Sequence, residues 1–250
     1  MLAFQTQKPD QRNGHYFRFI VDGGPEFSPQ FFDDGWLQAS DVLSGHASGG
    51  RATAQFLNIE NTSLVLRRFR RGGFARRLST SDYIWTGLEQ TRAFAEFNCL
   101  VALDAQRLPA PKPYACEVVR SGITYQASLI THRIAGQTLA KMQQGVDGLK
   151  ESVMHQVGRC IARFHSAGVC HADLNAHNIL VELAPEPKVS LIDFDKALLQ
   201  QHAQLEWRQK NLDRLHRSLR KEQNKRDVDQ PIAHWQSLLA GYRAELSGNK

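Results

Sequence analysis

The strongest constraint on the fold comes from a polar segment enclosed by regular elements. Residues 149–167 carry apolar side chains at helical spacing, and Gly168 is suited to end that helix. The polar segment HADLNAHN (171–178) follows, and two short apolar runs then lead to the sequence DFD (193–195). Short apolar runs beside turns are typical of buried strands. The sequence therefore predicts a helix, a polar loop and two strands that hold the loop in place.

The side chains of this loop suit phosphoryl transfer from ATP. That reaction needs a carboxylate near the acceptor hydroxyl and hard oxygen ligands for Mg²⁺ beside the phosphates. Asp173 is the candidate catalytic base, while Asn178 and Asp193 are the candidate metal ligands. Asp195 is either a further carboxylate near the metal and acceptor or a solvated turn residue. The loop therefore predicts an ATP-dependent phosphotransferase.

The rest of the chain divides into a part rich in strands and a part rich in helices. Strand patterns and one helical pattern, which starts at Asp82, precede a break near 131–136. Helical patterns dominate afterwards, including 203–225 and 231–246. We expect an α+β chain with an N-terminal antiparallel sheet lobe and one helix over 1–131, and a mainly helical C-terminal lobe over 132–250.

The loop motifs resemble those of the protein-kinase-like fold. The pattern H-R-D-x-x-x-x-N followed by D-F-G has its counterpart here in H-A-D-L-N-A-H-N and D-F-D. The arginine of the first motif is missing, so control by activation-loop phosphorylation is not expected. No A-P-E follows Asp195, and the remaining chain is short for a peptide-binding lobe. The resemblance thus implies a two-lobed kinase whose acceptor is not a protein.

The same resemblance places the ATP-binding residues in the first lobe. Gly45, Gly49 and Gly50 resemble a glycine loop over the phosphates, although a plain hairpin turn fits them as well. Arg67 stands where the family has its ATP-binding lysine, and Glu96 would be its acidic partner. A surface Arg and a surface Glu would look the same, and Arg68 replaces Arg67 if the strand is shifted by one residue.

Longer segments are similar to one bacterial branch, the heptose and Kdo (3-deoxy-D-manno-octulosonic acid) kinases of the lipopolysaccharide core. The similarity covers roughly residues 40–240 and rests on 67–97, 169–180, 191–197 and 207–221. It is greatest to the kinases that act on Kdo. It implies phosphorylation, with ATP and Mg²⁺, of the 4-hydroxyl of Kdo in Kdo-lipid IVA. A heptose kinase of the same branch stays open.

Charge fits an anionic acceptor at a membrane surface. The formal net charge is +6, and an arginine-rich run near residue 70 offers candidate acceptor-binding residues: Arg70, Arg71, Arg76 and Arg77. Lys210, Arg214, Arg217 and Lys221 share one stripe of the helix expected at 203–225. Such a stripe either faces an anionic membrane or is simply solvated. We expect peripheral binding to the cytoplasmic face of the bacterial inner membrane.

Composition and motifs also argue against several other classes of protein. No apolar run is long enough to span a bilayer, the first residues lack a signal-peptide pattern, and the four cysteines form no C-x-x-C pair. Aminoglycoside kinases need acid-rich acceptor sites, which the arginine run does not offer. A nucleic-acid-binding module fits the charge but lacks a recognised RNA-binding or zinc-knuckle motif. An inactive kinase-like scaffold is disfavoured by the complete loop. We expect neither a nucleic acid nor a protein partner.

Overall fold

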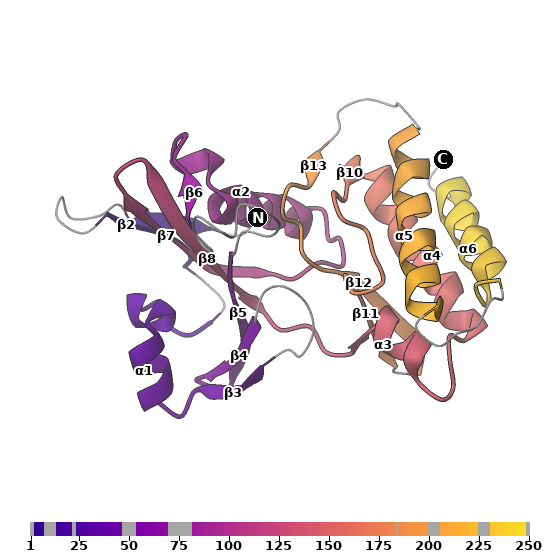
Figure 1. Cartoon of the computed structure of the whole chain (residues 1–250), viewed down its shortest axis with the longest axis horizontal. Helices are drawn as coiled ribbons and strands as arrows, with labels where there is room; N and C mark the ends of the chain where they lie inside the picture. The colour runs from indigo at the N-terminus through magenta and orange to yellow at the C-terminus, as the bar shows by residue number, and fades with distance from the viewer. Residues whose placement is uncertain are drawn as a thin grey trace. The chain divides into compact units, whose positions relative to one another are not determined.

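The computed structural model describes residues 3–7, 14–21, 24–46, 54–69, 82–183, 185–199, 206–224 and 231–248 (Figure 1). The chain forms two compact units, Met1–Ala105 with Pro111–Arg133, and Gln106–Ala110 with Ile134–Lys250. Segment 106–110 groups with the second unit, although the sequence analysis placed it in the first. Its backbone is held there, because Leu191 N donates to Pro109 O at 3.0 Å and Arg163 Nη2 donates to Arg107 O at 2.9 Å.

The first unit is built on one antiparallel sheet. Its strands are β1 (Phe4–Gln7), β2 (His15–Ile20), β3 (Leu43–His46), β4 (Ala54–Ile59), β5 (Thr62–Arg68), β6 (Tyr83–Ile84), β7 (Pro113–Ser121) and β8 (Thr124–His132). They are ordered β1-β2-β7-β8-β5-β4-β3, and β6 pairs with β8. The predicted hairpin around Gly122 is confirmed, since Ser121 pairs with Thr124 across the turn. Alternation of apolar and polar residues along these strands gives the sheet its buried faces.

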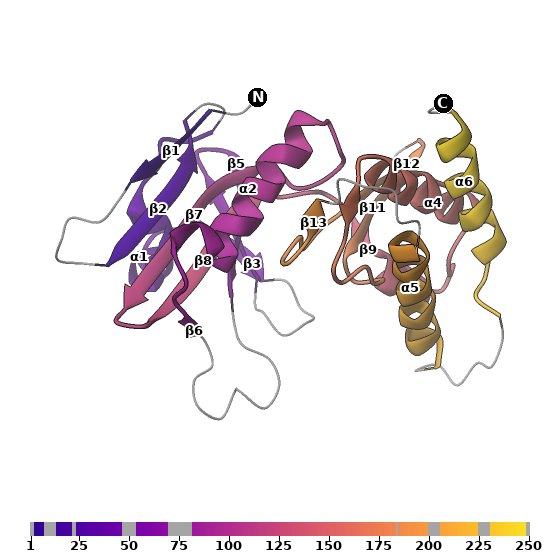
Figure 2. The same ribbon diagram turned by 90° about the horizontal axis from the view of Figure 1, so that it is seen from above.

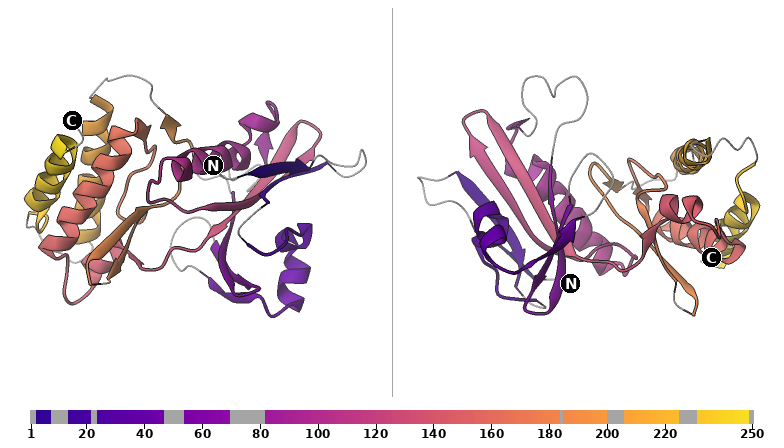
Figure 3. Two further views of the ribbon diagram at one scale, coloured as in Figure 1. Left: turned by 180° about the vertical axis from the view of Figure 1, so that it is seen from behind. Right: turned by 60° about the horizontal axis from the view of Figure 1, so that its bottom comes forward.

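Two helices cover opposite faces of this sheet (Figure 3). On one face, α1 (Asp34–Ala39) adds Leu37 to an aromatic core that includes Phe17 and Phe32. On the other, α2 (Arg92–Ala105) packs on β7 and β8, as Figure 2 shows. The sequence did not predict α1, which the side chain of Asp33 caps at Trp36 N (2.6 Å).

The predicted start of the long helix at Asp82 is wrong, because α2 begins at Arg92. Tyr83–Ile84 instead extends the sheet as β6, where Ile84 pairs with Thr124 of β8. Gly87 then has a φ of 124°, which a residue with a side chain rarely adopts, and a 3₁₀ turn at Leu88–Gln90 leads into the helix. A long-range strand pairing has thus replaced the first turns of the expected helix.

The second unit is mainly helical. It contains α3 (Leu139–Gln144), α4 (Glu151–Ser166), α5 (Glu206–Asn224) and α6 (Trp235–Gly248). Its short strands are β9 (Gln137–Thr138), β10 (Val169–Cys170), β11 (Ile179–Leu183), β12 (Pro187–Leu191) and β13 (Leu198–Leu199), ordered β12-β11-β9 and β10-β13. The predicted amphipathic helix is confirmed as α4, and Gly168 after it has a φ of 74°. The α+β fold class is therefore as predicted.

The final helix begins at Trp235 rather than at the predicted residue 231. Pro231 precedes it in a non-helical segment, and Trp235 N donates to Ile232 O at 3.3 Å in the turn that leads into the helix. Among the helices in the described ranges, none combines the length and the hydrophobicity needed to cross a membrane.

Helices α4 and α6 approach each other through glycines. A Cβ atom at Gly241 would lie 2.1 Å from His155 O, so alanine there would force the helices apart. We expect Gly241→Ala to lower the free energy of unfolding by about 1–3 kcal/mol, the range for overpacked cores. Denaturant unfolding would measure this loss. Gly248→Ala on the same helix is the control, since nothing lies within 4 Å of its added Cβ; equal stability losses would contradict the close approach.

Candidate active site

His171 organises the loop between β10 and β11. The ring is buried, its Nε2 lies 3.0 Å from Ile192 O, and its Nδ1 lies 3.2 Å from Asp173 N. A backbone N–H can only donate, so Nδ1 accepts and the proton sits on Nε2. Burial lowers the pKa of His171, against the smaller opposing influence of Asp193 and Asp173. The neutral ring that both hydrogen bonds require is therefore the favoured form.

Asp173 presents its carboxylate at the surface of this loop. Its side chain is 61% exposed, and Asn175 Nδ2 donates to its Oδ2 at 3.0 Å. Arg214 Nη1 lies 3.3 Å from the other oxygen, Oδ1. The side-chain oxygen of Asn175 also accepts from His177 N and Asn178 N, which folds the loop into a tight turn. The carboxylate is thus held from two sides and remains accessible.

Asn178 is hydrogen-bonded to Asp173, and the residue that precedes Asp193 is hydrogen-bonded to Asn178. Asn178 Nδ2 donates to Asp173 O at 2.9 Å, and Ile192 N, next to Asp193, donates to Asn178 O at 3.0 Å. Since the amide nitrogen of Asn178 is used, its Oδ1 is left to accept from or ligate another group. Hydrogen bonds thus link Asp173 to Asn178, and Asn178 to the residue directly before Asp193.

Asp193 has a left-handed backbone conformation, with a φ of 66°. Such a conformation costs about 1 kcal/mol for a residue other than glycine and is often found at functional sites. Phe194 anchors the turn, because its ring packs 5.5 Å from that of Phe164 and 5.0 Å from that of His171. Asp195 follows in the same turn and is half-buried.

Helix α5 holds the loop along most of its length. Asn211 Nδ2 donates to His171 O (3.1 Å), and Ser218 Oγ accepts from Ala176 N (3.1 Å). At the end of the helix, Glu222 Oε1 lies 3.1 Å from His177 Nε2. These residues were not predicted from the sequence. Their signal is a polar row at positions 211, 218 and 222 beside the buried leucines of the same helix, Leu212, Leu215 and Leu219.

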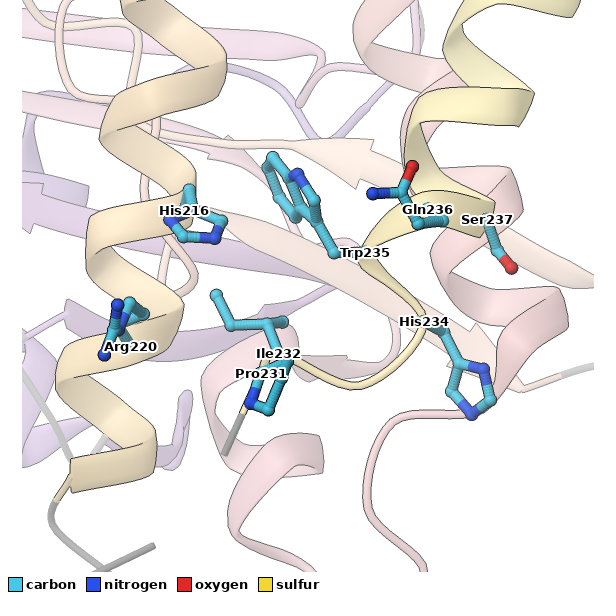
Figure 4. Close-up of a pocket in the computed structure, with 8 residues that line it drawn as sticks. All are labelled: His216, Arg220, Pro231, Ile232, His234, Trp235, Gln236 and Ser237. Carbon is cyan, nitrogen blue, oxygen red and sulfur yellow. The ribbon is translucent and has the colours of Figure 1, made fainter. Parts of the chain in front are cut away.

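A separate hollow lies between α5 and the start of α6 (Figure 4). It has a volume of about 670 Å³, and its lining is His216, Arg220, Pro231, Ile232, His234, Trp235, Gln236 and Ser237. His216 and Trp235 meet edge to face, with ring centroids 4.8 Å apart. None of the predicted site residues lines this hollow.

In the first unit, the predicted pairing of Arg67 with Glu96 is present. Arg67 Nη2 on β5 forms an ion pair with Glu96 Oε2 on α2, and the Glu96 side chain is 3% exposed. The guanidinium of Arg67 also lies over the ring of Phe69, 4.7 Å from its centroid. Arg68 leaves the strand on the other side and pairs with Asp34 at 2.6 Å. The strand register therefore selects Arg67 over Arg68 as the partner of Glu96.

Other predicted site residues lie partly or wholly outside the described residues. Gly45 is described, with a φ of 147° where the pairing of β3 with β4 shifts register. Gly49 and Gly50 lie outside the described residues, as do Arg70, Arg71, Arg76 and Arg77. The glycine loop and the arginine cluster therefore stay predictions.

Substitutions of Arg67 and Arg68 test which of the two arginines pairs with Glu96. Arg67→Ala removes the cation that forms an ion pair with the buried Glu96, so we expect a loss of about 3–5 kcal/mol in the free energy of unfolding. Arg67→Lys keeps a cation and should retain more stability and activity. Arg68→Ala removes the ion pair with Asp34, which is 62% exposed, and the hydrogen bond to Phe32 O, and it should cost less than Arg67→Ala. Thermal unfolding and the KM for ATP would measure these changes, and a greater loss in Arg68→Ala would contradict the register.

The two units and the loop define the class of kinases with a protein-kinase-like fold. Residues 35–242 match the family described as "Lipopolysaccharide kinase (Kdo/WaaP) family". This match covers most of the chain, and the chain belongs to that family.

Similarity to individual proteins points the same way. The 3-deoxy-D-manno-octulosonic acid kinase of Vibrio parahaemolyticus serotype O3:K6 is 39% identical over 210 residues, 83% of each chain. That of Haemophilus influenzae (strain 86-028NP) is 37% identical over 239 residues, 93% of this chain and 98% of the relative. That of Stenotrophomonas maltophilia (strain K279a) is 40% identical over 194 residues, 78% of this chain and 76% of the relative.

Proposed function

We propose that this protein transfers the γ-phosphoryl group of ATP to the 4-hydroxyl of Kdo in Kdo-lipid IVA, during assembly of the lipopolysaccharide inner core. The observation that carries the proposal is the loop in which His171 and Asn178 hold Asp173 in place. The relatives named as Kdo kinases support the choice of acceptor. A heptose kinase is the second candidate, because the sequence also resembles the heptose kinases of the lipopolysaccharide core, and the matched family is one of lipopolysaccharide kinases.

In this proposal Asp173 is the catalytic base. The acceptor oxygen attacks the γ-phosphorus, the bond to the oxygen that bridges the β- and γ-phosphates breaks, and ADP leaves. The proton of the hydroxyl passes to the Asp173 carboxylate. Asn175 and Arg214 keep that carboxylate in a fixed orientation through its two oxygens, which is how positioning lowers the barrier of such a transfer.

Asn178 and Asp193 fit a Mg²⁺ ion. The amide oxygen of Asn178 and the carboxylate of Asp193 are hard ligands, and the hydrogen bonds of Asn178 use only its side-chain nitrogen and its backbone. Within the described residues, no three His, Cys, Asp or Glu side chains gather as a metal site. This suits Mg²⁺, which often takes one or two protein ligands and completes its shell with phosphates and water. A Mg²⁺ ion bound by these two residues would neutralise part of the negative charge of the phosphates.

For the nucleotide, we propose that Arg67 contacts phosphate oxygens of ATP. An arginine is a permanent cation and offers two parallel donors to phosphate. The buried Glu96 carboxylate fixes the position of the Arg67 guanidinium, because one side of the guanidinium forms the ion pair with Glu96. The glycine loop with Gly45, Gly49 and Gly50 would cover the phosphates.

For the acceptor, we propose that Arg70, Arg71, Arg76 and Arg77 bind phosphates of the lipid. Because that acceptor is a lipid, the protein would work at the cytoplasmic face of the inner membrane as a peripheral protein. Its net charge of +6 favours an anionic surface.

The experiment is a comparison of acceptors. The protein is incubated with ATP and Mg²⁺ and either Kdo-lipid IVA or a heptosylated core, and mass spectrometry with linkage analysis locates the new phosphate. We expect phosphate at the 4-position of Kdo. Phosphate on heptose alone would select the second candidate, and turnover of neither acceptor would overturn both.

A further inference from the structure

The basic stripe of α5, defined as Lys210, Arg214, Arg217 and Lys221, lies beside the catalytic loop. Arg214 reaches Asp173, and one turn further along the helix Ser218 binds the loop backbone at Ala176. Arg217 lies between these two contacts in the sequence and about one turn from Arg214, which makes their side chains neighbours on the helix surface. The stripe therefore runs along the edge of the loop that carries the proposed base.

The charge of this stripe is only partly neutralised. Lys210 lies 3.9 Å from Glu206, and Arg214 shares Asp173 while its side chain stays 48% exposed. Arg217 and Lys221 are exposed, and in the described part of the chain no ion pair involves either of them. Two arginines thus offer free N–H donors to a ligand close to Asp173.

We propose that Arg214 and Arg217 bind the carboxylate of the acceptor sugar and so select an acidic sugar over a neutral one. The inference rests on the proposed function. In Kdo the carboxylate is attached two ring carbons from the carbon that bears the 4-hydroxyl, so a hydroxyl at Asp173 brings the carboxylate close to Arg214. A guanidinium matches a carboxylate with two parallel hydrogen bonds. Heptose has no carboxylate, so the two arginines would gain no ion pair from it.

The test pairs a protein variant with an acceptor variant. Kinetics are measured with Kdo-lipid IVA and with the same acceptor whose Kdo carboxylate has been converted to an amide. Arg217 does not touch Asp173, so Arg217→Gln reports on the acceptor alone. We expect Arg217→Gln to raise the KM for Kdo-lipid IVA at least about tenfold, the effect of losing a charged hydrogen bond, with the KM for ATP unchanged. The amide should raise the wild-type KM similarly, and the variant, which keeps only Arg214 of the pair, should distinguish the two acceptors less strongly than the wild type does.

Arg214→Lys should raise the same KM and also lower kcat, because Arg214 contacts Asp173. The matched control is Arg243→Gln, an exposed arginine on α6 in the same unit, which should behave as the wild type. The inference is overturned if Arg217→Gln discriminates between the acceptors as the wild type does, or if the wild type uses both equally well. That outcome is distinct from failure of the proposed function, in which the wild type phosphorylates neither acceptor.

A membrane role for the stripe gives a different result. In that case, vesicles of anionic phospholipid without any Kdo lipid would bind the wild type but not the Arg217→Gln variant. The KM for a deacylated, water-soluble Kdo acceptor would be the same for both proteins. That combination would overturn the assignment to the sugar carboxylate. Equal vesicle binding by both proteins, together with the rise in KM, would support it.

Discussion

Asp173→Asn is expected to lower kcat by about 10²–10⁴-fold, the range for loss of a general base, and to leave the affinity for ATP close to that of the wild type. Asparagine has the same size and can still accept the hydrogen bond that Asn175 donates. It cannot take a proton from the acceptor hydroxyl. Because the side chain is 61% exposed, the replacement buries no unpaired group and should not affect folding. Steady-state release of ADP in the presence of acceptor would measure kcat.

The control for this variant makes the same chemical change nearby. Asp213→Asn alters an exposed carboxylate on α5 that accepts from Gln209 at 2.8 Å, and it should keep the wild-type kcat. Retention of kcat by Asp173→Asn would remove Asp173 from the role of base. A loss in both variants would point to surface charge instead.

Asp193→Asn is expected to weaken the binding of Mg²⁺ and ATP at least about tenfold, as the loss of a charged ligand from a cation site implies. Asparagine is among the residues that best tolerate the left-handed conformation, so the φ of 66° should persist. The loss then reflects the missing charge rather than a refolded turn. The Mg²⁺ activation curve should shift to higher concentration, and calorimetry with ATP at fixed Mg²⁺ should show the weaker binding.

Asp147→Asn, at an exposed carboxylate between α3 and α4, is the matched control and should leave the activation curve in place. If Asp193→Asn also left it unchanged, Asp193 would not be a metal ligand.

Elements with a local sequence signal were predicted correctly from the residues alone. The apolar face of α4, the β7–β8 hairpin at Gly122 and the strand with Arg67 each depend on neighbours in the sequence. β6 was missed, because Tyr83–Ile84 becomes a strand only through its pairing with β8, about forty residues away. The helix α1 was missed because six residues are too few to show a helical period.

The candidate site divides in the same way. Asp173, Asn178 and Asp193 stand in a compact motif, and their types and order suggested the chemistry. The choice between Arg67 and Arg68 needed the structure, since adjacent strand residues point to opposite faces. The contacts of Asn211, Ser218 and Glu222 with the loop also needed it, because they join segments some forty residues apart.

The dependence of the loop on α5 has a consequence for how the protein is made. During translation, residues 171–178 leave the ribosome before the helix that binds them, and domains form as their last elements emerge. His171, Asp173 and Ala176 gain their partners at Asn211, Arg214 and Ser218 only after those later residues have been added. A nascent chain that ends before α5 therefore lacks these three contacts, and its loop is held only by bonds among residues 171–192, such as those of His171 with Ile192 O and of Asn178 with Asp173 O.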